Sequence, residues 1–133
     1  MTDIRWGILA TGGIAHAFTA DLRTAGLDVV AVGSRSAESA RAFAEQYGIA
    51  HAHGSYEALV ADPEVDIVYV ASPHSHHLAH ATLALEAGKH VLIEKAVTLD
   101  ADEAIALRDL AAARGLLVME AMWTRYLPHM VRV

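Results

Sequence analysis

The sequence predicts an α/β protein built as a doubly wound parallel sheet. Three observations support this fold class. Short apolar runs rich in valine and isoleucine alternate with longer helical patterns along the whole chain. The first apolar run passes through a glycine-containing turn directly into a helical pattern, and six such runs are present in all. Strands that alternate with helices form βαβ units with right-handed crossovers, and six strands match the doubly wound dinucleotide fold.

The first unit combines a strand at residues 4–10 with a helix at residues 14–25, and the turn between them reads ATGGIA. Gly12 and Gly13 would let main-chain N–H groups approach a phosphate, and the N-terminus of the helix favours an anion. Ala10 occupies the first position of the usual G-x-G-x-x-G/A pattern, so an ordinary strand–turn–helix is the alternative. The turn predicts a pyrophosphate site that needs support from the rest of the chain.

The later elements are bounded by capping residues. A serine or aspartate precedes three of the helical patterns, and a glycine follows three of them, as is typical of helix ends. The predicted N-caps are Ser36, Ser55 and Asp100, and the predicted stops are Gly48, Gly88 and Gly115. The remaining strands are expected at residues 28–34, 49–53, 65–71, 90–94 and 116–120. The remaining helices are expected at residues 37–47, 55–61, 76–87 and 100–114.

Composition limits the function classes. The chain has 133 residues, the length of one domain with a sizeable core. Its net charge is −6 and no basic cluster exists, which predicts no nucleic-acid partner. Cysteine is absent, which excludes disulfides, thiolate catalysis and cysteine-ligated metal and fits a cytoplasmic location. No apolar run reaches the roughly 18 residues of a membrane span, and the N-terminus does not read as a secretory signal.

The end of the second predicted strand selects the nucleotide in this fold. An acidic residue there binds ribose hydroxyls, whereas an arginine accommodates a 2′-phosphate. Here Ser34, Arg35 and Ser36 follow the strand without a carboxylate, and a guanidinium matches phosphate as a bidentate donor. The segment favours NADP, with NAD still possible, and the alternative is a solvated loop arginine. The missing carboxylate also argues against an S-adenosylmethionine-dependent methyltransferase.

Four histidines follow the fourth predicted strand, at His74, His76, His77 and His80. Zinc proteins use the i, i+4 spacing of His76 and His80, but no carboxylate lies within this segment. We therefore expect no metal site, and favour a histidine-capped helix start with His80 on the solvent side. Pro73 and the small residues beside it predict a tight turn next to the expected cofactor.

The fifth predicted strand ends at Glu94 and Lys95. A lysine at the carboxyl end of a central strand points into the crevice where this fold binds its ligand. Such a lysine can donate or polarise a proton at a carbinol or carbonyl oxygen, with Glu94 orienting it. The alternative is an exposed ion pair between the two side chains.

The last segment, MWTRYLPHMVRV at residues 122–133, carries large apolar and aromatic side chains with no evident partner. We therefore expect residues 1–121 to form a dinucleotide-binding domain. Residues 122–133 would begin the connection to a further domain of a longer protein.

Together these motifs resemble the N-terminal domain of the glucose–fructose oxidoreductase/inositol dehydrogenase (Gfo/Idh/MocA-type) family of NAD(P)-dependent oxidoreductases. The resemblance covers nearly all of the chain. It rests on SPHSHH at residues 72–77, ALEAGKHV at 84–91, and Glu94-Lys95 in place of a Glu-Lys-Pro signature whose proline is Ala96 here. RWGI at residues 5–8 and MEAMWTRYLP at 119–128 resemble the dimeric dihydrodiol dehydrogenase branch.

The resemblance implies an NADP-dependent enzyme that moves a hydride between nicotinamide and a carbinol or carbonyl of a sugar, cyclitol or trans-dihydrodiol. Lys95 would be catalytic, and Trp123 and Arg125 would border the substrate pocket. A second α+β domain would begin after Val133, complete the site and carry a homo-oligomer surface. The implied cofactor-binding residues are Thr11, Gly12, Gly13, Ile14, Ser34, Arg35, Ala71, Ser72, Pro73, His74, His77, Glu94 and Lys95.

Two other functions compete with this one. A regulatory module would bind the nucleotide without turnover, and Lys95 favours the enzyme because a sensor has no need of it. An isolated fragment would fold, bind cofactor and remain inactive.

Overall fold

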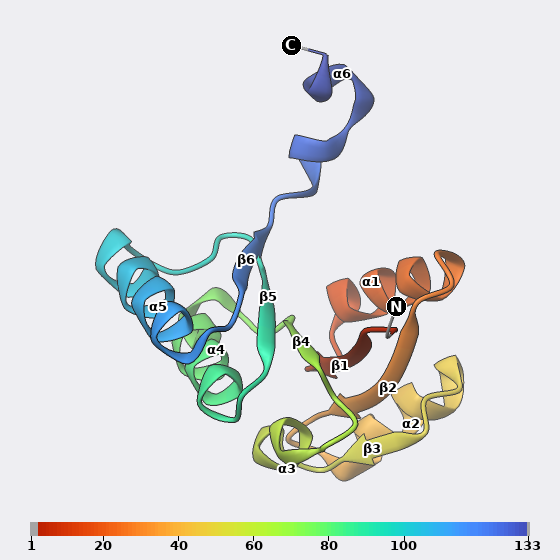
Figure 1. The fold of residues 1–133 in the computed structure, drawn as a ribbon. Coiled ribbons are helices and arrows are strands. Elements are labelled where there is room, and N and C mark those ends of the chain that lie inside the picture. Colours follow the sequence, from red (N-terminus) through yellow and green to blue (C-terminus); the bar gives the residue numbers. More distant parts are fainter. Residues whose placement is uncertain (1–2, 133) are drawn as a thin grey trace.

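The computed structural model describes residues 3–132 and confirms the doubly wound parallel sheet (Figure 1). Every strand pair is parallel, and the order across the sheet is β3-β2-β1-β4-β5-β6. This is the strand order of the dinucleotide-binding fold. Successive strands are added toward one edge of the sheet from β1 to β3 and toward the other edge from β4 to β6, so the strand order reverses between β1 and β4. The strands are β1 (Arg5–Leu9), β2 (Asp28–Gly33), β3 (His51–His53), β4 (Ile67–Val70), β5 (His90–Glu94) and β6 (Val118–Ala121).

Helices cover both faces of the sheet and give a three-layer arrangement (Figure 1). One face carries α1 (Gly13–Thr24) and α2 (Ala37–Tyr47). The other face carries α3 (Tyr56–Ala61), α4 (His77–Glu86) and α5 (Ala101–Arg114). The short elements are the 3-10 helices η1 (His74–His76) and η2 (Trp123–Tyr126) and the helix α6 (Pro128–Val131).

The core consists of two apolar clusters, one on each face of the sheet. Neighbouring residues of a strand contribute to opposite clusters because side chains alternate along a strand. Ile8 packs in the cluster beneath α1 and α2, whereas Leu9 packs beneath α3, α4 and α5. Burial on both faces explains why the strands read as continuous apolar runs rather than as alternating patterns.

The predicted caps are confirmed. Each predicted N-cap side chain accepts a hydrogen bond from a main-chain N–H three residues later, at 2.9–3.2 Å. Gly48 and Gly115 end α2 and α5 in the left-handed conformation, both with φ 65°. The ends of α2 and α5 also explain why the strands that follow them, β3 and β6, start two residues later than predicted. The N–H groups of Ile49 and Leu116 return to carbonyls of the preceding helices, at 2.9 Å each, so neither enters the sheet.

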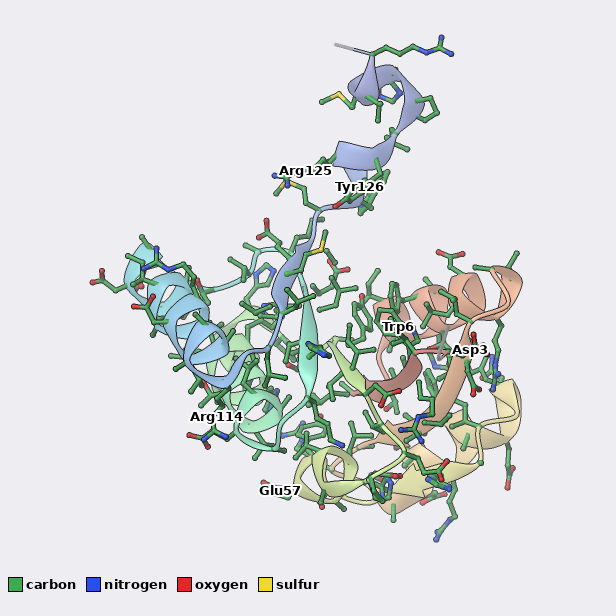
Figure 2. The ribbon with its side chains drawn as sticks, viewed as in Figure 1. Asp3, Trp6, Glu57, Arg114, Arg125 and Tyr126 are labelled. Atoms are coloured by element: carbon green, nitrogen blue, oxygen red, sulfur yellow. The ribbon has the colours of Figure 1, made fainter. Side chains whose placement is uncertain are left out.

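Beyond β6 the chain leaves the sheet as an arm formed by η2 and α6, which projects away from the rest of the chain (Figures 1 and 2). Below this arm, on the α1 side of β4, β5 and β6, lies a cavity of about 1120 Å³. Its lining includes Trp6, Phe18, Leu92, Met119 and Trp123. The predicted division at residue 121 stays a prediction. Among residues 3–132, no helix has both the length and the apolar character that a bilayer span requires.

Candidate functional site

A cavity of about 720 Å³ lies at the carboxyl ends of β1, β2, β4 and β5. It sits where the strand order reverses, the position at which open α/β sheets bind ligands. Every cofactor-binding residue predicted from the sequence, from Thr11 to Lys95, lines this cavity. Ala10 and Tyr56 line it as well and were not predicted. The structure thus brings the residues together, while contact of each with a nucleotide stays a prediction.

The glycine turn between β1 and α1 offers its main chain to the cavity. Gly12 is the N-cap of α1, and no side chain caps this helix end. A Cβ added at Gly12 or Gly13 would meet no atom within 4 Å, so the space beside the turn is open. Ala10 has φ 89°, a conformation that glycine adopts without cost and that explains the usual glycine at this position. The turn therefore fits a pyrophosphate held by main-chain N–H groups.

The segment after β2 is held by hydrogen bonds of Ser34 and Ser36, and Arg35 takes part in none of these. The N–H of Ser34 donates to the carbonyl of His53 at 3.1 Å. Ser34 Oγ accepts from the N–H of Ser36 at 3.2 Å, and Ser36 Oγ caps α2. Arg35 is exposed at the cavity, where Glu94 is the one carboxylate among the described lining residues. The segment can therefore hold a phosphate but has no acid for ribose hydroxyls.

Lys95 lies at the exposed edge of the cavity, and its main chain is fixed by Glu94. Glu94 Oε2 accepts from the N–H of Lys95 at 2.9 Å, and Oε1 accepts from the hydroxyl of Tyr69 at 2.8 Å. Burial, and then the nearby Glu94 carboxylate, raises the pKa of Tyr69. Among residues 3–132, no ion pair joins the Lys95 ammonium to Glu94, so the alternative of a strand-end ion pair is not observed.

Two histidines hold the chain that follows Lys95. His77 is fully buried, with Nδ1 2.8 Å from the carbonyl oxygen of Ala96 and Nε2 2.8 Å from that of Ser72. His74 Nε2 lies 2.6 Å from the carbonyl oxygen of Lys95 and 2.9 Å from the nitrogen of Ala96. The peptide bond between Lys95 and Ala96 is cis. These rings connect the β4 and β5 ends of the cavity.

His80 differs from its expected position. It is half-buried rather than on the solvent side, because Nδ1 lies 2.7 Å from Ser72 Oγ and the ring packs edge-on against Tyr56 at 4.7 Å. Burial, and then the nearby His76 and His77, lowers the pKa of His80. Sequence reasoning missed this because Tyr56 comes from α3, and its approach to α4 depends on the packing of two helices.

Trp123 and Arg125 lie on the arm beyond β6, and Figure 2 shows Arg125 away from the sheet. Trp123 lines the apolar cavity, and Arg125 lines neither cavity. The structure therefore does not bring them to Lys95, and their role at a substrate pocket stays a prediction.

Comparison with known proteins supports the fold and identifies the family. Residues 4–122 match the family described as "Oxidoreductase family, NAD-binding Rossmann fold". A D-xylose 1-dehydrogenase (NADP(+)) from Hypocrea jecorina is 48% identical over 98% of this chain and 37% of its own length. A trans-1,2-dihydrobenzene-1,2-diol dehydrogenase from Danio rerio is 41% identical over 98% of this chain and 40% of its own.

Among solved structures, a 3-ketoreductase from Actinomadura kijaniata in complex with TDP-benzene and NADP aligns with a TM-score of 0.93 at 34% identity. The alignment covers 98% of this chain and 42% of that one. The chain thus spans about two fifths of the length of these relatives. The resemblance and its dihydrodiol dehydrogenase-like branch are confirmed. The chain belongs to the Gfo/Idh/MocA family of oxidoreductases with an NAD-binding Rossmann fold.

Proposed function

We propose that this chain is the NADP-binding part of an oxidoreductase acting on a carbinol or carbonyl of a sugar, cyclitol or trans-dihydrodiol. The observation that carries the proposal is the single cavity that joins the Gly12–Gly13 turn, Arg35 and Lys95 across the β1–β4 reversal. The names of the relatives support the substrate class and the choice of NADP, since they include a D-xylose dehydrogenase specified for NADP(+) and diol dehydrogenases.

The binding half of the site consists of main-chain donors and one guanidinium. The N-terminus of α1 would hold the pyrophosphate through the N–H groups that follow Gly12. Arg35 would hold the 2′-phosphate, together with the hydroxyl of Ser34 and the positive end of the α2 dipole. Ser34 can donate its hydroxyl proton because its Oγ is an acceptor in its one described contact.

The chemical half of the site is Lys95. Bound NADP would supply the hydride acceptor, or the donor in the reverse direction. Lys95 Nζ would take the carbinol proton during oxidation and return it during reduction. Glu94, His74 and His77 fix the main chain around Lys95 and so set where its side chain starts. Trp123 and Arg125 would border the substrate in the whole protein.

The experiment compares NADPH with NADH. We expect the 133-residue chain to bind NADPH more tightly, and Arg35→Ala to remove most of the difference. A charge-assisted contact is worth about 1.5–3 kcal/mol, which corresponds to about a 10- to 150-fold change in affinity. Arg108→Ala is the matched control, because Arg108 is an exposed arginine on α5 that pairs with Asp109 at 2.8 Å. Equal affinity of the unmutated chain for both nucleotides would refute the choice of NADP.

Two further parts of the proposal concern the whole protein: its oligomeric state and its location in the cell. We expect a homo-oligomer formed through chain outside these 133 residues, and a cytoplasmic location. Light scattering of the full-length enzyme tests the first, and a monomer at working concentration would contradict it. Turnover by the full-length enzyme with a panel of sugars and diols separates an enzyme from a regulatory module.

A further inference from the structure

A second polar cluster lies outside the cofactor cavity, between the edge strand β3 and the end of α3. It consists of His51, His53 and Asp62, and none of them lines either cavity. His51 and His53 are two apart on β3, so both side chains project from the same face of the sheet. Both rings reach one carboxylate oxygen: His51 Nδ1 lies 2.6 Å and His53 Nε2 2.8 Å from Asp62 Oδ2.

The carboxylate of Asp62 is held in place before any ligand arrives. Its side chain is only 4% exposed, and its second oxygen, Oδ1, accepts from the N–H of Glu64 at 2.9 Å. The Lys89 ammonium fixes the same turn through the carbonyls of Asp62 and Val65, at 2.8 and 2.7 Å. Burial opposes ionisation, but hydrogen bonds from His53, the Glu64 main chain and His51 lower the pKa of Asp62 to about 2.

The donor atoms have the types that a metal site requires, and they lie near one another. Two imidazole nitrogens and one carboxylate oxygen lie within 4.8 Å of one another. Zinc bonds such donors at about 2.0–2.1 Å, which places tetrahedral ligands roughly 3.3 Å apart. The two hydrogen-bonded pairs, at 2.6 and 2.8 Å, would therefore separate by about 0.7 and 0.5 Å as coordination to the ion takes the place of the hydrogen bonds. A neutral imidazole can move its remaining proton to the other ring nitrogen, so both rings can become ligands.

We propose that His51, His53 and Asp62 bind a divalent first-row metal ion, with Zn²⁺ as the favoured ion, at a three-ligand site open to water. Mixed imidazole and carboxylate donors suit such ions. The imidazole side chains are 40% and 24% exposed, so solvent can reach the site and supply the fourth ligand.

The position of the cluster assigns the ion a structural role. β3 has three residues and pairs only with β2, which makes it the edge of the sheet. An ion bound by both histidines and Asp62 would link this edge strand to the turn after α3. Because only the folded chain brings the ligands together, binding would raise the melting temperature.

The experiment titrates Zn²⁺ into the 133-residue chain after treatment with a chelator, followed by calorimetry and thermal unfolding. We expect one ion per chain and a higher melting temperature. His53→Gln and Asp62→Asn should each weaken Zn²⁺ binding by at least about 10- to 100-fold, the loss that removal of an outer-shell partner already causes. His76→Gln is the matched control, since His76 stacks on His80 at 5.5 Å in the other histidine cluster.

A result in which the unmutated chain binds no Zn²⁺ would overturn the proposal. So would a control in which His76→Gln loses as much affinity as His53→Gln, because the ion would then sit at the η1–α4 histidines. If His53→Gln fails to fold by circular dichroism, His51→Gln replaces it, since His51 is the more exposed ligand. Co²⁺ as a probe gives visible absorption bands from nitrogen and oxygen coordination, and His51→Gln should remove them.

Discussion

Replacing Gly12 with valine should remove nucleotide binding and leave the fold intact. Gly12 has φ −78° and ψ −178°, an extended conformation that any residue adopts. A Cβ there would meet no atom within 4 Å, so the folded chain has room for a branched side chain. A pyrophosphate lying against the same main chain would lose that room. Valine is a poorer N-cap than glycine, and we expect this to cost less than about 1 kcal/mol of stability.

A second glycine gives the opposite pattern and serves as the control. A Cβ at Gly33 would lie 2.8 Å from Leu59 Cβ and 3.0 Å from its Cδ2, and Leu59 is fully buried. Gly33→Ala should therefore overpack the core at a cost of about 1–3 kcal/mol. For a chain of this length each kcal/mol lowers the melting temperature by about 3–5 °C.

The assay combines NADPH fluorescence titration with thermal unfolding for the three proteins. Each main-chain N–H that Gly12→Val separates from the pyrophosphate should cost about 1.5–3 kcal/mol, or about 10- to 150-fold in affinity. Gly33→Ala should unfold earlier than the unmutated chain. A folded Gly12→Val chain that binds NADPH with unchanged affinity would show that the pyrophosphate lies elsewhere.

Three further predictions concern the role of Lys95, the buried hydroxyl of Tyr69 and the main-chain conformation of Ala10. In the full-length enzyme, Lys95→Met should lower turnover by about 10²–10⁴-fold and leave NADPH affinity nearly unchanged, and a normal rate in steady-state assays would remove Lys95 from the mechanism. Burial and Glu94 raise the pKa of Tyr69 above its value of about 10 in the unfolded chain. The contribution of Tyr69 to the free energy of unfolding should therefore be fully present below about pH 10 and be lost as the pH rises above it. Ultraviolet titration should show Tyr69 ionising only on unfolding, and Tyr69→Phe should reduce the alkaline loss. Ala10→Gly should raise the free energy of unfolding in urea by about 1 kcal/mol by relieving φ 89°, and a lower value would contradict the strain argument.

Local chemistry explains how much of the fold was predictable from the sequence. Ser36 and Gly48 bound α2 through contacts within a few residues, and such contacts are visible as sequence patterns. The starts of β3 and β6 were wrong because the N–H groups of Ile49 and Leu116 bond back to the preceding helices. An apolar residue fits the start of a strand and the end of a helix equally well. Only the hydrogen bond of its N–H group tells the two positions apart, and the sequence does not show that bond.

The candidate site was predictable where it depends on strand ends. Lys95 follows β5 directly and Arg35 lies two residues after β2, and parallel strands bring their carboxyl ends to one edge. Tyr56 was missed, and His80 was wrongly expected on the solvent side, because their contact joins two helices whose relative position no local pattern records. The cluster of His51, His53 and Asp62 was missed for the same reason: Asp62 reaches β3 only through the path of α3.

The sheet order separates the two halves of the proposed chemistry. Arg35 follows β2 and Lys95 follows β5, with β1 and β4 between these two strands. Three strand spacings amount to about 14 Å, beyond the distance at which side chains couple directly. The phosphate contact and the proton transfer should therefore respond to mutation independently, Arg35→Ala changing cofactor preference and Lys95→Met changing turnover. A cofactor that serves both halves has to lie across the β1–β4 reversal, over the turn where Gly12 and Gly13 leave its path open.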